Sequence, residues 1–144
     1  MFLNKRERII NKAISKTVAE FSNRTPKIYQ HFFYGAFDLA PQNLAIWYLF
    51  ETDVEYEEAH KTGLCNELVA NTIHNLISCG YPEEALEKAD IYSKPYKFEF
   101  RGEASEEDLN YIRNAKNHRT VHISFTTQED IDRMTNGDYH LYFQ

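Results

Sequence analysis

Two aromatic-rich runs, residues 27–37 and 44–51, constrain the fold of this chain more than any other part of its sequence. Aromatic and β-branched side chains fill both runs, which is typical of β-strands. The turn-forming segment 38–43 between them predicts an antiparallel hairpin. In both runs, the side chains that alternate to either face of the strand are apolar. A strand that is apolar on both faces is usually covered on both. The hairpin is therefore predicted either to lie between layers of helices or to keep one face open for a partner.

Hydrophobic spacing and capping residues predict the other elements. The first helix ends before Pro26, because the residue before a proline disfavours the helical region. Thr52 with Glu55, and Thr126 with Glu129, form capping boxes that open two later helices. The predicted elements in chain order are a helix 4–22, strands 27–37 and 44–51, helices 52–61, 64–79 and 82–88, a strand 96–101, a helix 106–115, a strand 121–125, a helix 126–134 and a last strand 139–143.

These elements predict a single compact α+β domain over residues 1–144. We expect a mainly antiparallel sheet of about five strands, with an N-terminal helix and further helices packed on the sheet. Hydrophobic residues make up 42% of the chain and charged residues 26%, which is typical of globular proteins and excludes a disordered or collagen-like chain. The longest apolar run, residues 44–50, is too short for a membrane-spanning helix, which needs about 20 residues.

The cysteines and the N-terminal sequence predict a cytoplasmic protein. No apolar stretch and no small-residue cleavage site follow the basic residues near the N-terminus, so a secretory signal is not expected. Cys65 and Cys79 fall on one predicted helix, where their separation of about 21 Å exceeds the reach of a disulfide. Two free thiols indicate a reducing compartment.

Charge is divided unevenly along the chain, whose formal net charge is −6. Residues 1–27 hold seven basic and two acidic residues, whereas the remainder holds nine basic and twenty acidic ones. Acids at the starts of predicted helices complement the helix macrodipole, which explains each acidic cluster locally. Summed over the surface, the same acids would attract a cationic protein and disfavour nucleic acid.

The basic first helix is the one segment that could contact phosphates. Its polar face lacks aromatic side chains, so we favour a solvated face or docking on the acidic body. A nucleic-acid partner is therefore not expected.

The sequence contains no recognisable catalytic motif. Its six histidines show neither HExxH nor a paired metal-ligand spacing, and its cysteines form no CxxC. His122 and His140 occupy the polar registers of predicted neighbouring strands, where Asp138 could complete a small metal or acid–base site. The alternative is that both histidines are exposed cross-strand polar residues.

Neither cysteine is expected to be a nucleophile. Cys65 lies on the apolar stripe of its helix, and Cys79 lies at a helix C-terminus, where the macrodipole disfavours a thiolate. No catalytic residue, metal ligand or cofactor is predicted.

The aromatic residues of the hairpin are the strongest candidates for a binding site. Tyr29, Phe33 and Trp47 are predicted to share one face, which Phe37 would extend. Acids of the following helix would form a polar rim around these rings, as in tight protein interfaces. The alternative is that the N-terminal helix covers this face. The predicted partner-binding residues are Tyr29, Phe33, Trp47, Glu51, Asp53, Glu55, Glu57 and Glu58.

Two stretches carry a resemblance to a known class of protein. One begins at Phe33-Tyr34-Gly35-Ala36-Phe37 and continues through Trp47-Tyr48-Leu49-Phe50-Glu51-Thr52-Asp53; the other covers residues 123–133 and 139–143. They resemble small cytoplasmic immunity-type proteins of bacterial toxin–immunity systems. The resemblance implies an inhibitor that binds a cognate toxin domain, with acidic patches suited to a basic nuclease. It includes no catalytic motif and transfers no individual residue.

The sequence thus predicts a non-enzymatic protein-binding module, an immunity-like inhibitor that neutralises a toxin. Two alternatives from other classes stay open. One is a small metal-dependent or acid–base enzyme that uses His122 and His140, and the other is a nucleic-acid accessory protein that uses the basic N-terminal helix. No membrane partner is expected, and the oligomeric state is left open.

Overall fold

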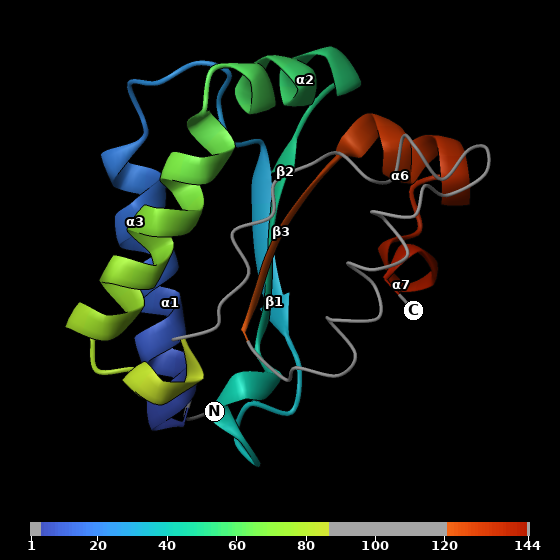
Figure 1. Cartoon of the computed structure of the whole chain (residues 1–144). Helices are drawn as coiled ribbons and strands as arrows, with labels where there is room; N and C mark the ends of the chain where they lie inside the picture. The colour runs from blue at the N-terminus through green and yellow to red at the C-terminus, as the bar shows by residue number, and fades with distance from the viewer. Residues whose placement is uncertain (1–3, 87–120, 144) are drawn as a thin grey trace, which may run out of the picture.

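The computed structural model describes residues 4–86 and 121–143, which form a sheet with helices on both faces (Figure 1). The three strands are β1 (Gln30–Tyr34), β2 (Ala45–Phe50) and β3 (His122–Thr127), in the order β1-β2-β3. β1 and β2 are antiparallel, which confirms the predicted hairpin, whereas β2 and β3 are parallel. The described part of the chain is therefore an α+β fold with a mixed sheet.

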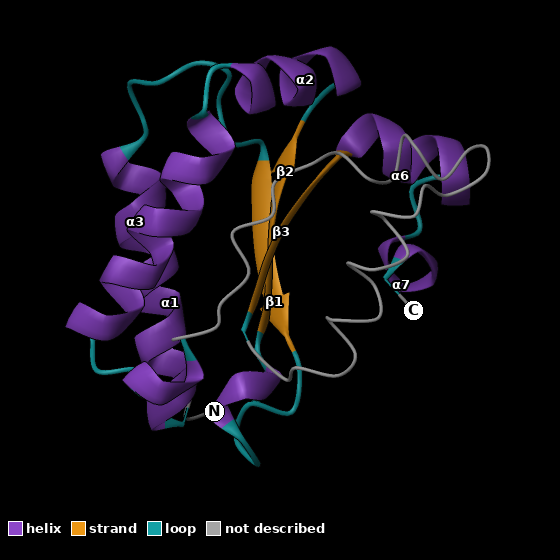
Figure 2. Cartoon of the chain, viewed as in Figure 1, coloured by secondary structure: helices purple, strands orange, loops and turns teal. Residues whose placement is uncertain are grey.

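The helices form two layers and a cap (Figure 2). One layer contains α1 (Lys5–Glu20) and α3 (Leu64–Ser78), which pack side by side, and the other contains α6 (Gln128–Thr135) and α7 (Tyr139–Tyr142). The cap is α2 (Asp53–Lys61), which crosses one end of the sheet and joins β2 to α3. Two short 3-10 turns complete the described elements, η1 (Pro41–Asn43) and η2 (Glu83–Ala85). No helix in these two described ranges is long and apolar enough to cross a membrane.

Both faces of β2 are covered, which decides between the two alternatives that its sequence left open. Ile46, Tyr48 and Phe50 alternate along one face and belong to the larger core, which they share with α1 and α3. Trp47 and Leu49 point to the other face and form a smaller core with α6. The large side chains that are completely buried are Tyr48, Phe50, Ile10, Ile14, Leu44, Ile46, Leu49, Leu64, Leu68, Leu76, Ile123 and Ile131.

The predicted last strand, residues 139–143, is wrong, because this segment contains the helix α7. Asp138 is the N-cap, and its side chain accepts a hydrogen bond from the backbone N–H of Leu141. Alternating hydrophobicity suggested a strand, but Tyr139, Tyr142 and Phe143 are also three and four positions apart and meet on one face of a helix. Their burial against the smaller core decides between the two patterns.

The predicted sheet also differs from the observed one. The described residues contain three strands, not about five, and one of the two strand pairs is parallel, so the sheet is not mainly antiparallel. The predicted strand 96–101 and helix 106–115 lie outside the described residues. The predicted helix 82–88 begins as the turn η2, and its last positions also lie outside.

Candidate functional site

The aromatic residues predicted to share one face are divided between the two faces of the sheet. Phe33 packs on the larger core, with its ring 5.8 Å from that of Phe37. Trp47 lies in the smaller core on the opposite face. Tyr29 precedes β1 and is 51% exposed. A continuous aromatic groove on the hairpin is therefore not formed.

Aromatic side chains near the C-terminus cover Trp47. The ring of Phe143 lies 5.0 Å from that of Trp47 and 4.6 Å from that of Phe32, both in edge-on contacts. The Nε1–H group of Trp47 donates to the hydroxyl of Tyr34 at 3.3 Å. Only 8% of Trp47 is exposed, so this residue stabilises the core and offers little surface to a partner.

Two of the predicted rim acids are engaged inside the fold. Asp53 accepts a hydrogen bond from the Thr127 hydroxyl at 2.7 Å and forms an ion pair with Arg133 at 2.9 Å. Glu55 completes the predicted capping box, since its carboxylate accepts from the backbone N–H of Thr52 and its backbone N–H donates to the Thr52 hydroxyl. These contacts hold the start of α2 in place and leave neither carboxylate freely presented to a partner.

The starts of α2 and α6 meet at one corner of the sheet because β2 and β3 run parallel and each leads directly into a helix. Thr52 caps α2, as predicted. The N-cap of α6 is Thr127, one residue later than the predicted Thr126. Glu129 links the two helices: its carboxylate accepts from the backbone N–H of Asp53 at 3.0 Å, and its own N–H donates to the Glu51 carbonyl at 3.1 Å. Two positive macrodipole ends at one corner explain why acids concentrate there.

Sequence reasoning missed the pair formed by Arg133 and Asp130. Asp130 is 3% exposed and accepts hydrogen bonds from Arg133 at 2.6 Å and from the Tyr142 hydroxyl at 2.5 Å. Hydrogen bonds to Asp130 and Asp53 raise the pKa of Arg133. The spacing of three positions between Asp130 and Arg133 on a predicted helix signalled the local pair. Nothing in the sequence placed Asp53 beside them.

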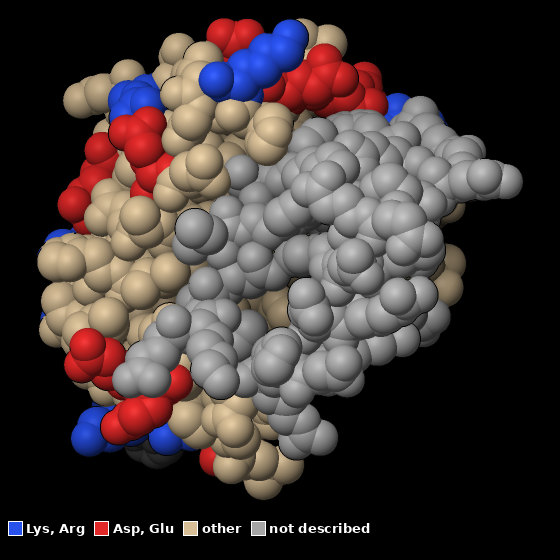
Figure 3. Space-filling view, viewed as in Figure 1, with Lys and Arg blue, Asp and Glu red and all other residues tan. Residues whose placement is uncertain are grey.

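The predicted rim acids that remain exposed lie on α2 or directly before it. Glu51, Glu57 and Glu58 are exposed, and Figure 3 shows acidic side chains gathered over this helix. Val54 is 73% exposed and shares a face with Glu57 and Glu58, because these positions are three and four residues apart. Lys61 is also exposed on the same helix. We call Glu51, Val54, Glu57 and Glu58 the α2 surface.

The predicted site between His122 and His140 is not formed as proposed. His122 begins β3, whereas His140 is exposed on the helix α7, so no pair of neighbouring strands brings the two rings together. Among the described residues, no group of three or more histidine, cysteine or acidic side chains is placed to hold a metal ion. Cys65 is completely buried, and burial raises the pKa of its thiol to about 12, which fits its predicted place on an apolar stripe.

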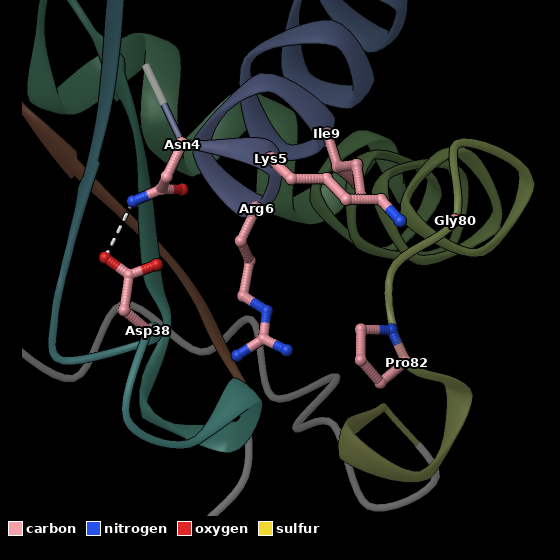
Figure 4. Close-up of a pocket in the computed structure, with 7 residues that line it drawn as sticks. All are labelled: Asn4, Lys5, Arg6, Ile9, Asp38, Gly80 and Pro82. Carbon is pink, nitrogen blue, oxygen red and sulfur yellow. Dashed lines mark hydrogen bonds between the residues drawn. The ribbon is translucent and has the colours of Figure 1, made fainter. Parts of the chain in front are cut away.

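A pocket of about 430 Å³ lies at the end of the molecule opposite α2 (Figure 4). It is bordered by the first turn of α1, the loop after β1 and the turn after α3. Arg6 is held there by a hydrogen bond to the Phe37 carbonyl at 2.6 Å, and Asn4 donates to the Asp38 carboxylate at 2.7 Å. Lys5 also borders this pocket, whereas no residue of the predicted site does.

No family model, curated protein or solved structure matches this chain. The resemblance to immunity-type proteins therefore stays a hypothesis.

Proposed function

We propose that this protein is a non-enzymatic binding module, an immunity-like inhibitor that neutralises a cognate toxin. The α2 surface carries the proposal, because it combines the exposed carboxylates of Glu51, Glu57 and Glu58 with the exposed apolar side chain of Val54. The partner of matching chemistry is a cationic protein, for which a nuclease domain is the toxin class we expect.

The chemistry of the α2 surface suits a protein partner. Several carboxylates on one surface accelerate the diffusional encounter with a cationic protein and orient that protein as it approaches. Val54 adds apolar area that a partner can bury, as in the core of a protein interface. Glu57 and Glu58 lie on a helix whose start is fixed by the Thr52–Glu55 capping box. The backbone is therefore already ordered, and binding a partner costs little conformational entropy there.

The corner where α2 and α6 begin is less suited to an anionic substrate. Helix starts at the carboxyl ends of parallel strands commonly bind phosphate groups. Here Asp53, Glu129 and Asp130 already occupy this position and form hydrogen bonds with donors of the protein itself. An incoming anion would meet these carboxylates, which favours a structural role for the corner over a catalytic one.

The proposal places the protein in the cytoplasm. Its two cysteines, Cys65 and Cys79, are free thiols. Free thiols are typical of proteins from reducing compartments.

Charge reversal on α2, with a matched reversal elsewhere, tests the proposal. The test variant is E57K/E58K and the control is E83K/E84K, which makes the same charge change at exposed positions of η2. Partners are captured from the native host at low salt with the wild type and both variants, identified by mass spectrometry and then purified. We expect a cationic partner that is retained by the wild type and the control but lost with E57K/E58K.

The purified partner then gives the decisive measurements. We expect its association rate at low salt to fall about tenfold or more for E57K/E58K, and expect the difference to shrink as salt rises. Co-expression of the wild type should rescue cells from the partner, and E57K/E58K should rescue them less well. Equal association rates for the wild type and both variants, or a partner that is harmless to cells, would contradict the proposal.

A further inference from the structure

A line of four cations runs along the exposed side of α1. Lys5, Arg8, Lys12 and Lys16 follow one another at spacings of three, four and four positions, which places them on one side of a helix. All four are exposed. With a rise of 1.5 Å per residue, the line is about 16 Å long. We call these four residues the α1 stripe.

The α1 stripe has no acidic partner within the described residues, since no ion pair or side-chain hydrogen bond there involves any of its members. The acids of α1 are directed elsewhere, because Glu7 is hydrogen-bonded to Asn4 and Glu20 to Asn75. The buried side of α1 is the opposite one, with Ile10 and Ile14 in the larger core. The stripe is therefore not docked on an acidic part of the described structure.

The other basic residues near the N-terminus behave differently, which sets the stripe apart. Arg6 donates to the Phe37 carbonyl, Arg24 pairs with Glu67 at 2.7 Å, and Lys27 donates to the Ser22 carbonyl. These three cations serve the fold. The four basic residues near the N-terminus that make no such contact within the described residues are the members of the α1 stripe.

The side chains around the stripe distinguish among anionic partners. Asn11 and Ser15 are exposed beside it and can hydrogen-bond to phosphate oxygens. The exposed large hydrophobic side chains of the described residues include none from α1. A helix that lies in a membrane interface needs an exposed apolar side, so a lipid surface is a poor fit. Base recognition through stacking needs aromatic side chains, which are also lacking on this side.

Contrary to the expectation from the sequence alone, we infer that the α1 stripe binds the phosphate backbone of a nucleic acid without sequence preference. Evenly spaced cations on a rigid helix neutralise successive phosphates and release the counterions bound to them. This inference does not depend on the proposed function, because it concerns α1 and not the α2 surface.

The test measures binding of the full chain to a fluorescein-labelled DNA duplex of about 20 base pairs at a series of salt concentrations. With four phosphate contacts, log K should fall with log salt at a slope of about −3.6, which is roughly a 100-fold loss of affinity between about 50 and 200 mM salt. The variant K12Q/K16Q should bind more weakly at low salt and reduce the slope to about half. Glutamine and lysine have similar helix propensities, so α1 should be retained, which circular dichroism checks.

The control variant is K61Q, which removes an exposed cation from α2 and should bind DNA as the wild type does. Three results would overturn the inference. They are a wild-type slope shallower than about −1, equal weakening by K61Q and K12Q/K16Q, or tighter binding to phosphatidylserine vesicles or polyglutamate than to DNA at the same salt concentration.

Discussion

Arg133 on α6 forms an ion pair with Asp53 on α2 at 2.9 Å, and so joins the helices that follow two different strands. The same guanidinium lies 2.6 Å from the carboxylate of Asp130, which is almost completely buried. The corner of the sheet where β2 and β3 end is therefore held together by one cation between two acids. This arrangement makes Asp53 a structural residue, although the sequence suggested a place on a binding rim.

Replacing Arg133 by glutamine should destabilise the protein. Buried Asp130 would lose a charged partner, and Asp53 would lose its link to α6. We expect the free energy of unfolding to fall by about 1–2 kcal/mol, less than for a fully buried pair because 35% of the Arg133 side chain is exposed. Urea unfolding near neutral pH measures this difference.

The exposed pair Arg24–Glu67 provides the matched control. Its side chains are 44% and 50% exposed, and ion pairs of this kind add little to stability because water and salt screen them. The Arg24→Gln variant should therefore unfold at nearly the same urea concentration as the wild type. Equal destabilisation by the two substitutions would show that Arg133 is no more than a surface cation.

Replacing Phe143 by alanine should expose Trp47. Phe143 contacts both Trp47 and Phe32 edge-on, so its loss removes aromatic contacts and opens the smaller core to water. We expect a loss of about 2 kcal/mol in the free energy of unfolding, below the value for a fully buried phenylalanine. The chain has a single tryptophan, so its fluorescence spectrum reports the change directly and should shift to longer wavelength.

Leu141→Ala is the control for this experiment, since Leu141 belongs to the same short helix but is 55% exposed. It should leave both the fluorescence spectrum and the stability close to those of the wild type. A Phe143→Ala spectrum identical to that of the wild type would mean that the C-terminal rings do not cover Trp47 in solution.

Local signals in the sequence predicted most of the described elements. The boundaries of α1, α2 and α3 agree closely with prediction because apolar spacing and the Thr52–Glu55 capping box are properties of neighbouring residues. The hairpin was also predictable, because its two strands are close in the chain. The parallel pairing of β2 with β3 was not, since their register, such as Tyr48 opposite Phe125, depends on residues distant in sequence.

The candidate site was less predictable for the same reason. Exposure of Glu57 and Glu58 follows from their positions opposite the buried side of α2. The burial of Trp47 depends on where residues 139–143 pack. It was not predictable, because the hydrophobic pattern of these residues fitted both a strand and a helix. Asp53 looked like a free acid because its partners are distant in sequence: Thr127 is the last residue of β3, and Arg133 lies on α6.

The hairpin loop should not tolerate a side chain at Gly35. Its φ is +120°, and a Cβ atom would lie 2.0 Å from the carbonyl oxygen of Asn43. Gly63 also has a positive φ, +82°, but a Cβ atom there would meet nothing within 4 Å. We expect Gly63→Ala to cost about 1 kcal/mol through backbone strain alone, and Gly35→Ala to cost at least about twice as much. Thermal unfolding of both variants measures the difference, and equal melting temperatures would contradict a close approach at Gly35.

Stability should decline in mildly alkaline solution because burial keeps Cys65 protonated in the folded state. Burial raises the pKa of its thiol from 9.0 to about 12, and that of the Tyr48 hydroxyl from 10.0 to about 12. At a pH between the unfolded-state and folded-state pKa values of these two groups, the unfolded chain binds fewer protons than the folded one. The contribution of the two groups to the free energy of unfolding is therefore complete below about pH 8 and is lost as the pH rises toward 12. We expect the free energy of unfolding to fall by about 1–2 kcal/mol between about pH 8 and pH 10. Urea unfolding across this range should show a shallower decline for Cys65→Ala than for the wild type, and an unaltered pH dependence in Cys65→Ala would rule out Cys65 as its cause.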